Sequence, residues 1–118
     1  MKIWSDSFQD GKPIPGEFAF CVIDPSSHVK LSGNHNPHLA WGDLPAQTRS
    51  FALICHDVDV PSKADDLFKE DREIPATLPR VDFYHWALID IPASVTSIAA
   101  GEFASGVVAK GKPGPGAK

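Results

Sequence analysis

The sequence predicts a mostly β domain, and three observations support this fold class. Apolar residues recur with a period of two in several runs, which is typical of strands. Helical spacing of apolar residues is scarce. The 11 prolines and 9 glycines of the 118-residue chain separate the runs by irregular loops. This length is typical of one domain, and an apolar content of 42% is enough for a core.

Four segments are expected to form strands. Residues 18–23 are apolar on both faces, so we expect a central strand there that ends before Pro25. Residues 50–55 form a second buried strand by the same pattern. The clearest strand is expected at residues 81–91, where one face carries Val81, Phe83, His85, Ala87, Ile89 and Ile91. An early strand is expected within residues 2–8.

One short helix is expected after Ser62. Ser62 and Asp65 resemble the start of a capping box, and Ala64, Leu67 and Phe68 have helical spacing. This helix would have about two turns and end in the charged residues 70–73. A second short turn is expected in residues 94–100, and loops in residues 12–16, 26–37 and 75–79.

Charge and composition exclude several classes of partner and location. Fifteen acidic residues against 11 basic ones give a formal net charge of −4, and no basic block is present, which argues against nucleic acid. No apolar run approaches the roughly 18 residues of a membrane span, and no signal-peptide pattern begins the chain. We therefore expect a cytoplasmic protein, with Cys21 and Cys55 as buried thiols rather than a disulfide.

A pair of carboxylates follows the predicted strand at residues 50–55. Alternation places Asp57 and Asp59 on the same side while the chain stays extended. Two carboxylates that project together need donors, a cation or a shared proton. Either they accept hydrogen bonds from local backbone N–H groups in a turn, or they face a ligand.

A histidine occupies the more apolar face of the predicted strand at residues 81–91. His85 is either a satisfied core residue or part of a pocket whose walls are Phe83, Tyr84 and Trp86. If His85 meets Asp57 or Asp59, its imidazole gains a partner for the charged form and can donate to an anion.

No cofactor or metal is expected. His35 and His38 are three positions apart, but Pro37 prevents a regular helix through both, and no cysteine cluster accompanies them. The chain also lacks a nucleophile elbow, a phosphate-binding loop and a dinucleotide-binding glycine motif.

Three segments, taken in order, resemble the phosphatidylethanolamine-binding protein family, also called Raf-kinase-inhibitor-like proteins, in its prokaryotic branch. Residues 36–41 (Asn-Pro-His-Leu-Ala-Trp) are similar to the family's Ser-Pro-x-Leu-x-Trp. Residues 57–62 (Asp-Val-Asp-Val-Pro-Ser) are similar to its Asp-Pro-Asp-Ala/Val-Pro-Ser, with Val58 in place of proline. Residues 82–86 (Asp-Phe-Tyr-His-Trp) and the later Asp-Ile-Pro resemble its His-Trp strand and the turn after it.

The resemblance implies a large central antiparallel sheet beside a smaller sheet, with short peripheral helices. It also implies a non-enzymatic protein with a small pocket for phosphate-like anions or phosphorylated head groups. Carried over by motif, the residues lining that pocket would be Asp57, Asp59, Pro61, Phe83 and His85. Eukaryotic members modulate kinases, so the resemblance further implies a regulator of protein partners.

Two other functions stay open. One is a small hydrolase or isomerase that uses Asp57 and His85 as an acid–base pair, and the other is a pure interaction module. A further third of the chain follows in the family. We therefore expect residues 1–118 to be one domain lacking its C-terminal third, with residues 111–118 as an exposed loop or cleavage site. A retained C-terminal fragment or a neighbouring protomer would then complete the fold.

Overall fold

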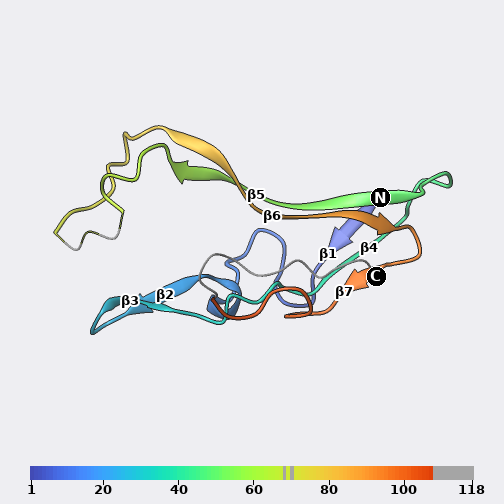
Figure 1. Ribbon diagram of the computed structural model, residues 1–118, viewed down its shortest axis with the longest axis horizontal. Helices are drawn as coiled ribbons and strands as arrows, with labels where there is room; N and C mark the ends of the chain where they lie inside the picture. The colour runs from blue at the N-terminus through green and yellow to red at the C-terminus, as the bar shows by residue number, and fades with distance from the viewer. Residues whose placement is uncertain (68, 70, 108–118) are drawn as a thin grey trace. The chain divides into compact units, whose positions relative to one another are not determined.

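The computed structural model describes residues 1–67, 69 and 71–107, and it confirms a mostly β, antiparallel fold (Figure 1). The expected loop or cleavage site at residues 111–118 lies outside the described residues. The described chain contains the 3-10 turn η1 (Gly16–Phe18) and the strands β1 (Lys2–Trp4), β2 (Cys21–Asp24), β3 (His28–Leu31), β4 (Leu39–Gly42), β5 (Ser50–Pro61), β6 (Arg80–Pro92) and β7 (Ser97–Ile98).

The chain divides into two compact units. The first unit comprises Met1–Gln47 and Ser94–Lys118, and the second comprises Thr48–Ala93. The first unit contains a three-stranded sheet in the order β1-β4-β7 and the separate hairpin β2–β3. The second unit is built on the β5–β6 hairpin, which carries all five expected site residues.

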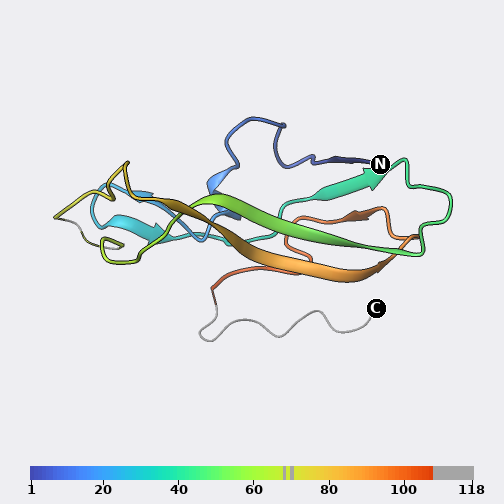
Figure 2. The same ribbon diagram turned by 90° about the horizontal axis from the view of Figure 1, so that it is seen from above.

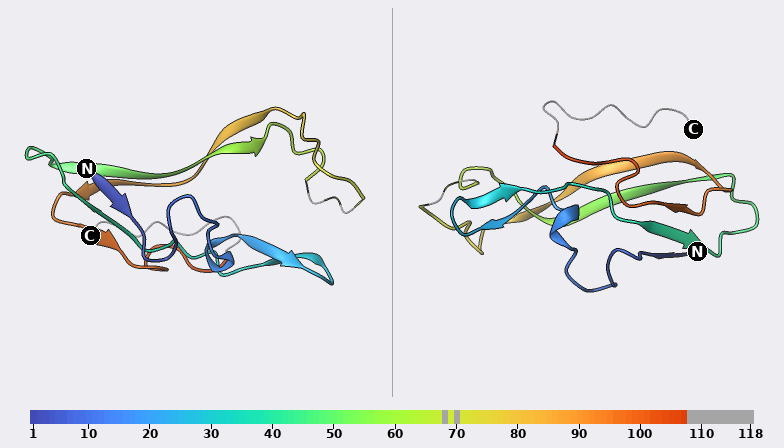
Figure 3. Two further views of the ribbon diagram at one scale, coloured as in Figure 1. Left: turned by 180° about the vertical axis from the view of Figure 1, so that it is seen from behind. Right: turned by 90° about the horizontal axis from the view of Figure 1, so that it is seen from below.

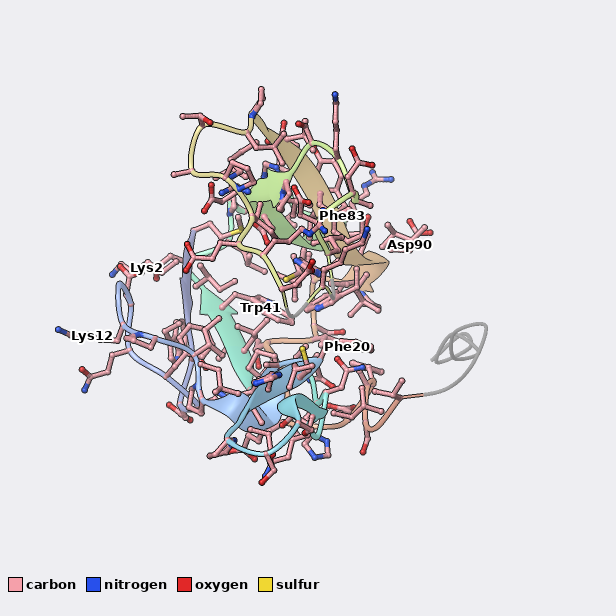
Figure 4. All side chains as sticks on the ribbon, turned by 90° about the vertical axis from the view of Figure 1, so that its left-hand side faces the viewer. Lys2, Lys12, Phe20, Trp41, Phe83 and Asp90 are labelled. Atoms are coloured by element: carbon pink, nitrogen blue, oxygen red, sulfur yellow. The ribbon has the colours of Figure 1, made fainter. Side chains whose placement is uncertain are left out.

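The three-stranded sheet supplies most of the core of the first unit. Ala40, Trp41 and Ile98 are buried, and Trp41 is only 3% exposed. The indole N–H of Trp41 donates to the carbonyl of Val95 (2.8 Å), so the large ring is buried without losing its hydrogen bond. Figure 4 labels Trp41 on the β4 ribbon.

Asn36 precedes β4 and is the one buried polar residue among the described ones. Its side-chain N–H groups donate to the carbonyls of Pro37 and Ala99, and its Oδ1 accepts from the backbone N–H groups of Phe103 and Ala104. Burial of the amide is favourable because each polar atom has a partner. Asn36 therefore ties the start of β4 to the chain after β7.

The strand expected at residues 18–23 is shorter than predicted and begins three residues later. Phe18 ends the η1 turn, where its N–H donates to Pro15, and β2 begins only at Cys21. In the described chain β2 pairs with β3 alone, and Ile23 is 89% exposed, so the expectation of a central strand is wrong. The sequence pattern could not distinguish an apolar run buried on both faces from an exposed hairpin.

The strand β3 lies inside the segment expected to be a loop. Its partner β2 ends at Asp24, whose Oδ1 accepts from the N–H groups of Ser26 and Ser27. This turn reverses the chain, and His28 leaves it with φ of 62°. The β2–β3 hairpin is visible in Figure 3.

The β5–β6 hairpin contains both strands expected at residues 50–55 and 81–91, but β5 continues to Pro61. Figure 2 shows the two strands side by side and twisted about each other, as antiparallel ribbons are. Three shifts of register interrupt the ladder. One leaves His85 without a partner between the pairs Cys55–Trp86 and His56–Tyr84, and another adds a residue to β5 between Asp57 and Val60.

The third register shift overturns the expected face assignment at the end of β6. Asp90 has φ of 55°, and the ladder passes from the pair Leu53–Leu88 to the pair Phe51–Ile91. The extra residue turns Ile91 onto the face of Leu88, where it is buried, whereas Ile89 is 69% exposed. The predicted face that joined Ile89 and Ile91 is therefore wrong.

The helix expected after Ser62 is not formed by the described residues of that segment. Residues 62–67 form a bend and a turn, closed by a hydrogen bond from Leu67 N–H to the Ala64 carbonyl. Ser62 instead donates its N–H to the carbonyl of Pro79, which continues the pairing of the two strands. The cross-strand bond thus uses the residue that would have capped the helix.

Candidate functional site

The bulge at His85 brings its imidazole to a carboxylate on the neighbouring strand. Nε2 of His85 lies 3.3 Å from Oδ2 of Asp57, and both side chains are about half exposed. An ionised carboxylate only accepts hydrogen bonds, so Nε2 must carry the proton and donate. The other ring nitrogen, Nδ1, is then the atom that His85 can offer to a ligand.

Asp57 is held on both of its oxygens. Oδ1 accepts the backbone N–H of Asp59 (2.8 Å), and Oδ2 faces His85. Two hydrogen bonds lower the pKa of Asp57: the larger effect comes from the Asp59 N–H and the smaller from the His85 imidazole. The charge of His56 lowers this pKa further. Asp57 therefore orients the imidazole of His85 through one oxygen. Its other oxygen makes the local backbone hydrogen bond that the turn interpretation expects.

Phe83 lies directly opposite Asp57 in the ladder. Its ring meets that of His85 edge to face, with centroids 5.0 Å apart, and 49% of Phe83 remains exposed. Figure 4 labels Phe83 on this hairpin. The ring restricts the imidazole and provides an apolar wall beside it.

Asp59 and Pro61 lie farther along the hairpin than the motif alone indicated. The extra residue in β5 turns Asp59 away from Asp57, and Asp59 Oδ1 instead lies 3.6 Å from Nε of Arg80. Pro61 is paired with Arg80 at the end of the ladder, about 16 Å along β6 from His85. The structure thus brings together Asp57, Phe83 and His85, and places Asp59 with Arg80.

A second imidazole–carboxylate pair, which sequence reasoning missed, occupies the opposite face of the hairpin. His56 Nε2 lies 3.2 Å from Asp82 Oδ1, and the His56 ring stacks on Tyr84 with centroids 4.7 Å apart. His56 and Asp57 are consecutive in a strand, so their side chains point to opposite faces. The missing information was the register, because His56 meets Tyr84 only once the two strands are aligned.

In the described part of the chain, the other side chains that could bind a metal ion or act as a nucleophile form no such site. Cys21 and Cys55 are free and half-buried. Burial and the nearby charge of Asp57 raise the pKa of the Cys55 thiol, which makes it a poor nucleophile. Among residues 1–67, 69 and 71–107 no group of three or more His, Cys, Asp or Glu side chains is arranged to hold a metal ion.

The depressed pKa of Asp57 leads to a pH prediction. Because this pKa lies below the usual value of 3.8, the contacts of ionised Asp57 stabilise the hairpin above that pH. That contribution is lost as the pH falls through the lower value of the folded state. We expect His85→Ala to raise the pKa of Asp57 but to leave it below the usual value, because the Asp59 N–H still donates. Carboxyl ¹³C titration by NMR measures the pKa of Asp57 in the wild type and in His85→Ala. An unchanged pKa in the variant contradicts the contribution assigned to His85.

The antiparallel strands and the polar cluster on a bulged hairpin define a β-rich protein with an imidazole–carboxylate site. The chain belongs to the phosphatidylethanolamine-binding protein family, whose model matches residues 4–115. It is 31% identical over 110 residues to the UPF0098 protein YbhB of Escherichia coli, covering 92% of this chain and 54% of that protein. A UPF0098 protein of Aquifex aeolicus is 29% identical over 98 residues, covering 83% of this chain and 41% of that protein.

Three further findings concern the length of the relatives, the solved structures and the helices of the chain. The chain spans about half the length of the curated relatives it matches. No solved structure matches the chain. Among the described residues, no helix has the length and apolar character needed to cross a membrane.

Proposed function

We propose that this protein binds a small phosphate-like anion at His85 and acts as a binding protein rather than an enzyme. The observation that carries the proposal is the contact of His85 Nε2 with Asp57 Oδ2, which leaves Nδ1 as the ring nitrogen that can bind a ligand. When the imidazole is protonated, Nδ1–H can donate a charge-assisted hydrogen bond to a phosphate oxygen. Membership of the phosphatidylethanolamine-binding protein family supports the same choice of ligand.

The surroundings of His85 favour binding over catalysis. Phe83 provides an apolar edge beside the imidazole, and Asp57 holds the ring in place through Nε2. A hydrolase or isomerase would use the same Asp57–His85 pair as a base. The nearby thiol of Cys55 is a poor nucleophile because its pKa is raised. If the protein turns over a small phosphorylated substrate and the Asp57→Asn variant loses this activity, the proposal of a binding protein is overturned.

The test is an NMR titration with inorganic phosphate that follows the imidazole signals of His85 and His56. These two histidines form a matched pair, because each lies next to an aspartate on the same hairpin but on opposite faces. We expect saturable shifts at His85 and only small ones at His56. His85→Ala should weaken binding about tenfold or more, the effect of losing one charge-assisted hydrogen bond, whereas His56→Ala should leave the affinity nearly unchanged.

Two results would overturn the proposal. One is the absence of shifts at His85 in the wild-type protein, and the other is equal affinity in wild type and His85→Ala. Backbone amide spectra of each variant, compared outside the hairpin, establish that the fold is retained. If His56→Ala abolishes binding and His85→Ala does not, the anion binds on the opposite face of the hairpin, at His56.

A further inference from the structure

The outer face of the β5–β6 hairpin, which carries His56 and lies opposite the face of Asp57, is exposed on both strands. Its residues are Ala52, Ile54, His56 and Val58 on β5 and Asp82, Tyr84, Ala87 and Ile89 on β6. Ile54 is 54% exposed and Ile89 is 69% exposed. Soluble proteins seldom leave large apolar side chains together in water, so this outer face is a candidate interaction surface.

Four residues of the outer face form an apolar block in which large and small side chains alternate. Ile54 lies directly opposite Ala87 in the ladder. Ala52 lies opposite Ile89 and Asp90, which share one place at the register shift. The two isoleucines therefore lie on one diagonal of the block and the two alanines on the other. Each isoleucine projects from the face beside an alanine, whose short side chain leaves room above it.

This apolar block is complementary to a second copy of itself. Two copies can stack face to face about a two-fold axis that lies between them, either along the strands or across them. Under either axis each isoleucine of one copy meets an alanine of the other, so large side chains fill the room above small ones. Charge opposes the contact little, because Asp82 lies 3.2 Å from His56 in its own copy. The same symmetry keeps the two copies of Asp90 from facing each other.

We propose that two copies of this chain associate through the outer faces of their β5–β6 hairpins, with the isoleucines of each copy packed on the alanines of the other. Standard interfaces bury about 800 Å² per partner. A face only two strands wide is at the low end of that scale, so we expect a reversible dimer with a dissociation constant of about 10–100 μM. His85 lies on the opposite face from His56, so the association does not depend on the proposed anion.

The test is sedimentation equilibrium of the 118-residue chain over about 10–500 μM protein. The wild type should pass reversibly from monomer to dimer. Ile54→Ala removes one projecting side chain from each copy and should weaken the dimer about tenfold or more. Ala87→Ile fills the room that the opposing isoleucine needs, so it should also weaken the dimer about tenfold although it adds apolar surface.

The matched control is Ala76→Ile, which adds the same side chain at an exposed position between β5 and β6 and should leave the dissociation constant unchanged. Backbone amide spectra of each variant establish that the hairpin is retained. A monomer at every concentration overturns the inference and leaves the outer face to a different polypeptide. An Ala87→Ile dimer at least as tight as the wild type also overturns it, because any apolar face would then adhere. A dimer that Ile54→Ala leaves unchanged forms through another surface and overturns it too.

Discussion

Replacing Asn36 by alanine is expected to lower the free energy of unfolding by about 3–5 kcal/mol. The substitution removes the acceptor of the Phe103 and Ala104 N–H groups and the donor to the Ala99 carbonyl. Because Asn36 is only 4% exposed, water does not readily replace these partners. A polar group left without a hydrogen bond at a buried position costs about 1–3 kcal/mol, and all four side-chain hydrogen bonds of Asn36, to Pro37, Ala99, Phe103 and Ala104, are lost. Equilibrium urea denaturation followed by circular dichroism measures the loss.

Asn34→Gly is the matched control for this substitution. Asn34 makes one side-chain hydrogen bond, to the Gly106 carbonyl, and its φ of 48° suits glycine. We expect a loss of about 1 kcal/mol or less. If the two variants lose the same stability, Asn36 does not link β4 to the chain after β7 in the way its hydrogen bonds indicate.

Trp41→Ala is expected to cost about 3–5 kcal/mol as well, for a different reason. The substitution removes the largest buried side chain of the β1-β4-β7 sheet and the hydrogen bond to the Val95 carbonyl. Trp41→Phe retains most of the apolar contact and loses the donor, so its cost should be about 1–2 kcal/mol. The free energies of unfolding of both variants are measured by urea denaturation with far-ultraviolet detection.

Trp4→Ala provides the comparison for Trp41→Ala. Trp4 lies on the adjacent strand β1, paired with Ala40, but is 50% exposed. Its loss should cost about 1 kcal/mol or less, because much of its surface already contacts water. A cost for Trp41→Ala no larger than that for Trp4→Ala would show that Trp41 does not form the core of its sheet.

The existence of the long strands was predictable because their signal is local. The alternation in residues 81–91 and the proline at position 92 correspond to β6, which ends at Pro92. The strand β3 was missed although a signal was present: Asp24-Pro25-Ser26-Ser27 has the composition of a reverse turn with proline at its second position. That turn closes the β2–β3 hairpin.

The partners within the candidate site were predictable only in part. The motif residues Asp57, Phe83 and His85 could be picked from the sequence, and the structure places them together. Arg80 and the His56–Asp82 pair could not be assigned in this way. Their contacts depend on cross-strand alignment, and one added residue at a bulge changes which side chains meet.

By itself the sequence determined the β-rich fold class, the position of β6, the first half of β5 and the family resemblance, because strand periodicity and short motifs are properties of neighbouring residues. Only the tertiary structure decided that Asp57 meets His85, that Asp59 turns to Arg80, and that Ile91 is buried while Ile89 is exposed. The physical reason is the register of the hairpin. Three bulges shift the pairing, and each shift reassigns side chains that alternation alone would have placed on the other face.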